Sequence, residues 1–155
     1  MGVRGYLVDT NHIGDWERAE PVFMNHLNAL PPECLVRVSV ITLGEIQWSM
    51  GITLTTNQQR RDDYEVFVNR ELKPFALELT AQTSIYYGEI LKRIWQKYPP
   101  PASKETEAHL AELGVDINDV WIVAVAFERG LTLVTADKML VIREVLPEVT
   151  FESWK

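Results

Sequence analysis

The stretch Gly5-Tyr6-Leu7-Val8-Asp9-Thr10-Asn11 decides the fold, because an apolar run ends there in an acid, a hydroxyl and an amide. The apolar residues suit a buried strand. The three polar residues favour turns and helix caps. We therefore expect Asp9 where a central strand ends and a helix begins, at the edge where open α/β sheets bind ligands. Taken alone, Asp9 or Asn11 could equally serve only to cap that helix.

The bulk composition is that of a soluble globular protein, and we expect one domain over residues 1–155. No apolar run is long enough to span a bilayer, and no secretory signal is evident, so we expect no membrane partner. Cys34 is the single cysteine, which fits a reducing, cytoplasmic location. The net charge of -7 argues against diffuse attraction to nucleic acid, so any such contact requires locally placed cations.

Strands and helices are predicted to alternate along the chain. Apolar, β-branched runs predict strands at 6–8, 34–40, 75–79 and 131–134, with a possible fifth at 149–151. Helical periodicity predicts helices at 15–30, 40–50, 58–72, from Thr80 to Tyr98, 103–113, 116–129, and a short one from Asp137. The eight apolar residues Val120–Phe127 predict a buried helix. This order favours an α/β protein whose parallel sheet is covered on both faces.

Four acids fall at strand ends or in first turns of helices, namely Asp9, Glu45, Asp119 and Asp137. Each has a structural alternative. Glu45 could complete a capping box that begins at Thr42. Asp116 could cap the buried helix, with Asp119 complementing its dipole. Thr135 or Asp137 could cap the last helix.

The joint pattern of these acids indicates a cation site. In a parallel sheet Asp9 and Asp137 both emerge at strand carboxyl ends, and Asp119 opens the buried helix near the same edge. Two carboxylates about 4 Å apart repel by about 4 kcal/mol at an effective dielectric near 20, so protons or cations must neutralise them. Oxygen ligands favour Mg²⁺ or Mn²⁺, whereas the three scattered histidines do not suggest zinc. Such a metal suits phosphoryl-transfer chemistry without a nucleophilic side chain.

Four motifs resemble, in order, those of the PIN-domain ribonucleases, and among them the VapC-type toxins of bacterial toxin–antitoxin pairs. They are Leu7–Asn11 with Asp9, Ser39–Ile46 with Glu45, Asn118–Ala124 with Asp119, and Leu131–Asp137 with Asp137. Each motif is weak alone, but together they cover nearly the whole chain. The resemblance implies a PIN-like three-layer α/β/α fold with a central, mainly parallel sheet of four or five strands.

The resemblance also implies a divalent-metal-dependent endoribonuclease that hydrolyses RNA phosphodiester bonds. Mg²⁺ or Mn²⁺ would be held by Asp9, Asp119 and Asp137, with Glu45 as a further ligand or as the group that positions the attacking water. Supporting roles would fall to Thr10, Asn11, Asp116 and Thr135. A homodimer and a cognate antitoxin protein that blocks the site are implied as well.

Three features depart from that pattern. His12 stands where an aliphatic residue is usual, and we expect a partly exposed loop histidine, with substrate contact as the alternative. Trp121 and Val123 are bulkier than usual, so we expect the packing there to differ. The 99–114 stretch is long and could be a lid, a partner surface or a neutral insertion.

Two other functions are left open by the sequence. A haloacid-dehalogenase-like phosphatase also begins with a strand followed by Asp, but its second acid is here Asn11. A non-catalytic PIN-like binding module is the other. Basic residues cluster in the middle helices with aromatics nearby, and we expect them to be solvated charges over core rings; they are Arg60, Arg61, Arg70, Lys73, Lys92, Arg93 and Lys97.

Overall fold

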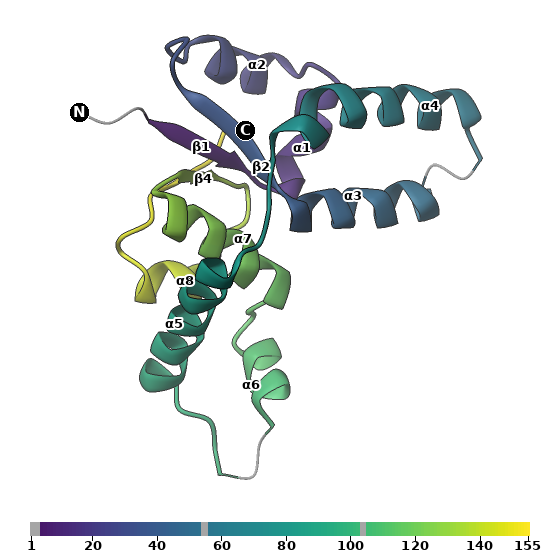
Figure 1. Cartoon of the computed structure of the whole chain (residues 1–155). Coiled ribbons are helices and arrows are strands. Elements are labelled where there is room, and N and C mark those ends of the chain that lie inside the picture. The colour runs from purple at the N-terminus through teal and green to yellow at the C-terminus, as the bar shows by residue number, and fades with distance from the viewer. Residues whose placement is uncertain (1–3, 54–55, 103–104) are drawn as a thin grey trace.

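Five parallel strands form the centre of the computed structural model, which describes residues 4–53, 56–102 and 105–155 (Figure 1). The strands are β1 (Gly5–Val8), β2 (Leu35–Ser39), β3 (Ala76–Leu77), β4 (Thr132–Val134) and β5 (Phe151–Glu152). Their order is β3-β2-β1-β4-β5, so β1 lies in the middle, with Leu7 paired to Arg37 on one side and Leu133 on the other. The predicted parallel α/β sheet is confirmed.

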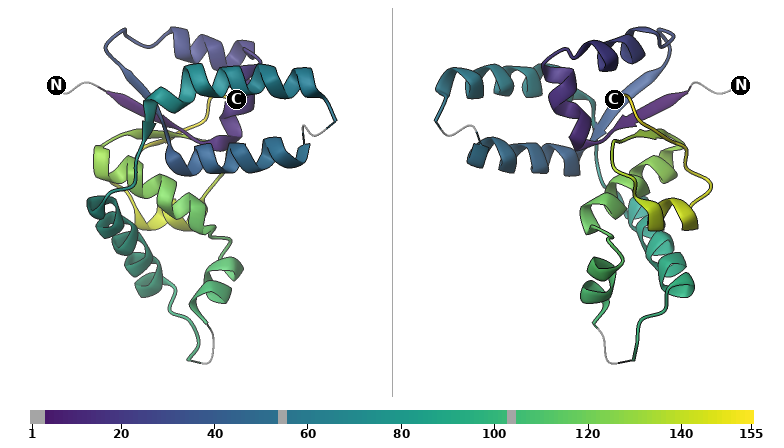
Figure 2. Two further views of the ribbon diagram at one scale, coloured as in Figure 1. Left: turned by 45° about the vertical axis from the view of Figure 1, so that its right-hand side comes forward. Right: turned by 180° about the vertical axis from the view of Figure 1, so that it is seen from behind.

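Helices cover both faces of this sheet (Figures 1 and 2). The side chains of β1 alternate between the two faces. Leu7 belongs to the core packed by α5 (Ala81–Lys97), α7 (Ile117–Arg129) and α8 (Leu140–Val145). Tyr6 and Val8 belong to the core packed by α1 (Ile13–Glu17), α2 (Pro21–Asn28), α3 (Val40–Thr53) and α4 (Gln58–Phe67). A strand buried on both faces needs apolar residues at every position, which is why its sequence does not alternate. The three-layer α/β/α fold is confirmed.

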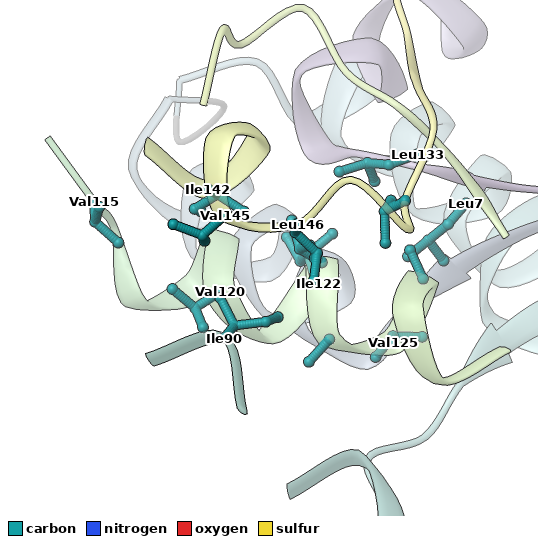
Figure 3. Close-up of a cluster of buried hydrophobic side chains, with 14 of the residues drawn as sticks. Leu7, Ile90, Val115, Val120, Ile122, Val125, Leu133, Ile142, Val145 and Leu146 are labelled. Carbon is teal, nitrogen blue, oxygen red and sulfur yellow. The ribbon is translucent and has the colours of Figure 1, made fainter. Parts of the chain in front are cut away.

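Helix α7 is the most buried helix of the described chain, as its apolar run predicts (Figure 3). Residues Ile122–Ala126 are fully buried between the sheet and α5. The Asp116 side chain caps the helix by accepting from Asn118 N–H at 2.7 Å, and Gly130 ends it in the left-handed conformation, φ 63°. Trp121 stacks on Tyr87 of α5 at 3.8 Å between ring centroids. These caps fix where the first turn of α7, with Asp119, begins.

Two predicted helices are wrong in their bounds. The helix expected over 15–30 is two helices, α1 and α2, separated at Ala19 with φ 52°. Pro21 lacks an N–H and keeps the preceding residue extended, so a continuous helix cannot pass through it. The helix expected from Asp137 begins only at Leu140, because the Asp137 N–H donates to Thr135 Oγ1 in a turn and Met139 is left-handed, φ 44°.

Two helical pairs extend away from the sheet in Figures 1 and 2. One is α3 with α4, which continues through a π-helical turn (η2, Val68–Leu72) and a 3₁₀ turn (η3, Lys73–Phe75) into β3. The other is α5 with α6 (Thr106–Glu112), the part of the predicted 103–113 helix that lies within the described residues. Among the described helices, none is both long and apolar enough to cross a membrane.

Candidate metal centre

Three carboxylates that are far apart in the sequence meet at the carboxyl edge of the sheet. Asp9 follows β1, Asp137 follows the neighbouring β4, and Asp119 lies in the first turn of α7. One oxygen from each lies within 4.8 Å of the others. Asp9 is buried, Asp119 is half-buried and Asp137 is exposed. The group therefore reaches from the interior to solvent.

The buried Asp9 carboxylate is held in place through both oxygens. Its Oδ1 accepts from the Thr10 N–H at 2.7 Å, and its Oδ2 accepts from Thr135 Oγ1 at 2.7 Å. The Asp9 N–H donates to the Val134 carbonyl at 2.9 Å, which continues the β1–β4 pairing by one residue. The acid is thus fixed relative to both central strands.

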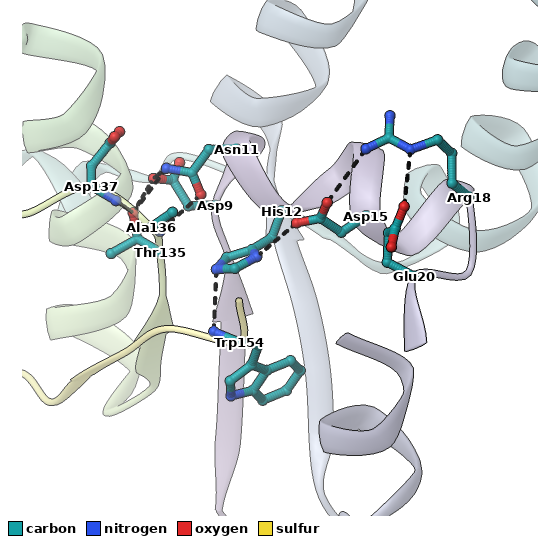
Figure 4. A network of polar contacts seen from close by, with 10 residues as sticks. All are labelled: Asp9, Asn11, His12, Asp15, Arg18, Glu20, Thr135, Ala136, Asp137 and Trp154. Carbon is teal, nitrogen blue, oxygen red and sulfur yellow. Dashed lines mark hydrogen bonds and ion pairs between the residues drawn. The ribbon is translucent and has the colours of Figure 1, made fainter. Parts of the chain in front are cut away.

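Asn11 and Thr135 join the loop after β1 to the loop after β4 (Figure 4). Asn11 Nδ2 donates to Thr135 Oγ1 at 3.2 Å, and Asn11 Oδ1 accepts from the Ala136 N–H at 3.0 Å. Thr135 Oγ1 also accepts from the Asp137 N–H at 3.1 Å. One buried hydroxyl therefore contacts the Asp9 side chain and the Asp137 backbone together.

Glu45 lies one helical turn inside α3 and is connected to the acids through Thr10. Thr10 Oγ1 donates to Glu45 Oε1 at 2.7 Å and lies 3.2 Å from Thr42 Oγ1. The alternative of a capping box at Thr42 is wrong, because α3 already begins at Val40 and Ser39 Oγ accepts from the Thr42 N–H at 3.2 Å. Glu45 is outside the group of three but close enough for its charge to act on Asp9 and Asp119.

Among the described residues, no ion pair joins Asp9, Asp119 or Asp137 to a cation. Burial, followed by the charges of Asp9, Asp116, Asp137 and Glu45, raises the pKa of Asp119 to about 7. Burial also raises the pKa of Asp9, against the opposing hydrogen bonds from Thr135 and Thr10. Within the described residues, no hydrogen bond reaches the Asp119 carboxylate. A set of oxygen ligands that retains a proton near neutral pH fits a hard divalent cation.

His12 is buried, so the expectation of a partly exposed loop histidine is wrong. Its Nδ1 lies 3.3 Å from Asp15 Oδ2, and its Nε2 accepts from the Trp154 N–H at 3.4 Å (Figure 4). Burial lowers the pKa of His12, although Asp15 acts in the opposite direction. Both ring nitrogens contact other residues of the protein, so His12 stabilises the loop after β1 from the protein interior. Neither Trp154 nor the buried Phe23 beside the ring could be paired with it from local sequence.

Most basic residues that cluster in the middle helices are paired with acids. Arg60 pairs with Glu17, Lys92 with Glu89, and Lys97 with Glu144 at 2.8 Å. Arg93 pairs with Glu89 at 3.1 Å and Glu148 at 2.8 Å. These pairs support the expectation that the charges belong to a solvated surface, and they leave those cations neutralised.

The fold and site define an α/β protein with a cluster of carboxylates at the carboxyl edge of a parallel sheet. The family model described as "PIN domain" matches residues 6–145, so the chain belongs to the PIN-domain family. No curated protein matches the chain.

Several solved structures share the fold. VapBC2 from Rickettsia felis bound to a promoter DNA fragment has a TM-score of 0.68 at 22% identity, over 97% of this chain and 99% of that one. DNA-bound VapBC from Salmonella typhimurium has a TM-score of 0.65 at 24% identity, over 99% of this chain and 100% of that one. VapBC-5 from Mycobacterium tuberculosis is a member of the VapBC family of toxin-antitoxin systems. It has a TM-score of 0.53 at 23% identity, over 96% of this chain and 98% of that one.

Proposed function

We propose that the chain is a divalent-metal-dependent endoribonuclease that hydrolyses RNA phosphodiester bonds. The observation that carries the proposal is the meeting of Asp9, Asp119 and Asp137 within 4.8 Å at the crevice edge of a PIN fold. The choice of RNA rests on the resemblance of the four motifs to the PIN-domain ribonucleases.

In this proposal Asp9, Asp119 and Asp137 hold Mg²⁺ or Mn²⁺. When bound, such a cation polarises the phosphodiester and lowers the pKa of an attacking water. Glu45 is a further ligand or orients that water, and Thr10 holds its carboxylate through the 2.7 Å hydrogen bond. Thr135 and Asn11 keep the loops after β1 and β4 in register, while Asp116 fixes the start of α7. No side chain needs to act as nucleophile.

The partners proposed for the chain follow from its neighbours. VapBC toxin–antitoxin systems supply several structures of the same fold, and we propose that this chain is likewise a toxin held by a cognate antitoxin. A homodimer, a cytoplasmic location and one PIN-like domain over 1–155 belong to the same proposal.

The phosphatase alternative has lost its basis. The chain belongs to the PIN-domain family, and the position where a dehalogenase-like enzyme needs a second acid is Asn11, whose amide joins two loops. The experiment described next distinguishes a non-catalytic PIN-like module from a nuclease.

The test is incubation of the purified chain with total RNA, in Mg²⁺, in Mn²⁺ and in chelator. We expect cleavage in either metal and none in chelator. Asp9→Asn and Asp119→Asn should each reduce cleavage by at least about 100-fold while circular dichroism stays that of the parent. Asp62→Asn, which alters an exposed acid on α4, is the matched control and should cleave at the parent rate.

Two results would contradict the proposal. If either site variant cleaves at the parent rate, the assignment of the acids is wrong. If the parent binds no Mn²⁺ by calorimetry and cuts no RNA, the chain is a non-catalytic PIN-like module.

A further inference from the structure

Two exposed cations, Lys138 and Arg143, lie in the segment that follows β4 and carries Asp137. Arg143, on α8, donates from Nη2 to the Asp137 carbonyl at 3.3 Å, and its guanidinium carbon lies 4.6 Å from the centre of the Phe151 ring. Lys138 directly follows Asp137 and is exposed. Within the described residues, neither side chain forms an ion pair with a carboxylate.

Several other cations of the described residues are paired with acids or lie away from the carboxyl edge of the sheet. Arg18, Arg60, Lys92, Arg93 and Lys97 are paired with acids. Arg4 and Lys73 precede β1 and β3, so they lie toward the opposite, amino edge of the sheet. A chain of net charge -7 cannot attract RNA diffusely, so it needs cations placed at the site itself.

Arg143 is also positioned before any substrate arrives. One of its five N–H donors is engaged by the Asp137 carbonyl and its plane is close to an aromatic ring, which leaves donors for a phosphate at little further entropic cost. The turn that carries Lys138 is held on one side by Thr135 Oγ1 and on the other by the left-handed Met139, φ 44°. Such strain in a non-glycine residue is retained where the surrounding structure requires that conformation.

We propose that Arg143 and Lys138 bind the phosphates of single-stranded RNA that flank the scissile bond at the acidic cluster. This inference rests on the proposed nuclease function and adds to it the residues that hold the substrate. It assigns substrate contact to the β4–α8 turn and to α8, and not to the basic residues of the middle helices.

The test measures RNA binding in the cleavage-deficient Asp119→Asn chain, with a short fluorescein-labelled RNA of mixed sequence. Arg143→Met keeps an unbranched side chain and removes the charge. We expect its Kd to rise roughly 3- to 10-fold, and the slope of log K against log salt, between about 50 and 200 mM, to fall by about 0.7. Lys138→Ala, at an exposed position, should change the Kd and the salt slope by similar amounts. Arg143→Lys, which keeps the charge, should have the salt slope of the Asp119→Asn chain.

The matched control is Lys92→Ala, which removes the same charge from an exposed position on α5. It should leave the Kd and the slope unchanged. If Arg143→Met and Lys138→Ala also leave both unchanged while the parent chain cleaves RNA, this inference alone is wrong. If the parent chain neither binds nor cleaves RNA, the proposed function fails and the inference fails with it.

Discussion

Asp119 is the member of the acidic cluster whose ionised form is stabilised least by the protein. No hydrogen bond from the described residues reaches its carboxylate, and burial together with four neighbouring acids raises its pKa to about 7. A carboxyl group with a raised pKa favours folding while it is protonated. Its contribution is complete below the unfolded pKa near 4 and is lost as the pH rises through about 7.

The pH dependence of stability should therefore differ between the parent and Asp119→Asn. In chelator, the variant should be more stable than the parent at about pH 8 and should lose that advantage at about pH 4.5. The expected change is about 1–2 kcal/mol, after a discount for the partial exposure of the carboxyl group to solvent. Urea unfolding of both proteins at the two pH values measures it. A difference that does not vary with pH would contradict the raised pKa of Asp119.

Thr135 offers a second test at the residue scale. It is 1% exposed, and its hydroxyl contacts Asp9, Asn11 and the Asp137 N–H. Thr135→Val keeps the shape but removes the hydroxyl's hydrogen bonds to Asp9, Asn11 and the Asp137 N–H, so we expect a loss of about 1–3 kcal/mol and weaker RNA cleavage. Thr135→Ser, which keeps the hydroxyl, should retain most of both. Urea unfolding and a cleavage assay measure the two effects.

Single residues differ in how far their sequence context predicts them. Asp9 and Asp137 could be placed at the same edge because each follows an apolar run that reads as a strand. His12 could not be placed, because its burial depends on Trp154 and Phe23, which come from other parts of the chain. For Glu45, local sequence also allows a capping role, whereas in the structure its carboxylate accepts a hydrogen bond from Thr10, thirty-five residues away.

At the scale of the elements, α7 follows its own sequence closely. Its cap at Asp116, its buried run and its end at Gly130 are local signals, and all three could be predicted. The break between α1 and α2 and the late start of α8 are different. Both depend on left-handed residues, Ala19 and Met139, whose conformations are set by the turns around them and not by their own side chains.

Two glycine substitutions should have opposite effects on stability. Gly130→Ala at φ 63° should cost about 1 kcal/mol, because an L side chain is strained there even though the space is open. Gly88→Ala, inside α5 with nothing within 4 Å, should stabilise by about 0.5–1 kcal/mol. Thermal or urea unfolding compares the two variants with the parent. If both substitutions stabilised the protein, helix propensity and not the left-handed conformation of Gly130 would control the stability change.

At the scale of the whole molecule, the sequence predicts a parallel sheet but not its order. Alternating strands and helices are compatible with several arrangements, and only the packing of both helix layers places β1 between β2 and β4. That central position brings residues 9 and 137 to adjacent strand ends. It also lets the first turn of α7 bring Asp119 to the same place.

Metal binding should stabilise the folded chain as a whole. At an Mn²⁺ concentration about 100 times the Kd, the gain should be about 2.7 kcal/mol, and the Tm should rise by several degrees. Asp9→Asn should show little of this rise, and the control Asp62→Asn should show all of it. Differential scanning fluorimetry with increasing Mn²⁺ measures the shift. An equal rise for both variants would place the cation elsewhere.

The spacing of the acids has a practical consequence for using the protein. Asp9 and Glu45 precede the α5–α6 connection, whereas Asp119 and Asp137 follow it. A chain divided after Pro101 would give two pieces with two acids each, and neither would contain the group of three. The proposed nuclease activity would then report whether the pieces reassemble, so the divided protein could serve as a two-component sensor for the association of proteins fused to it.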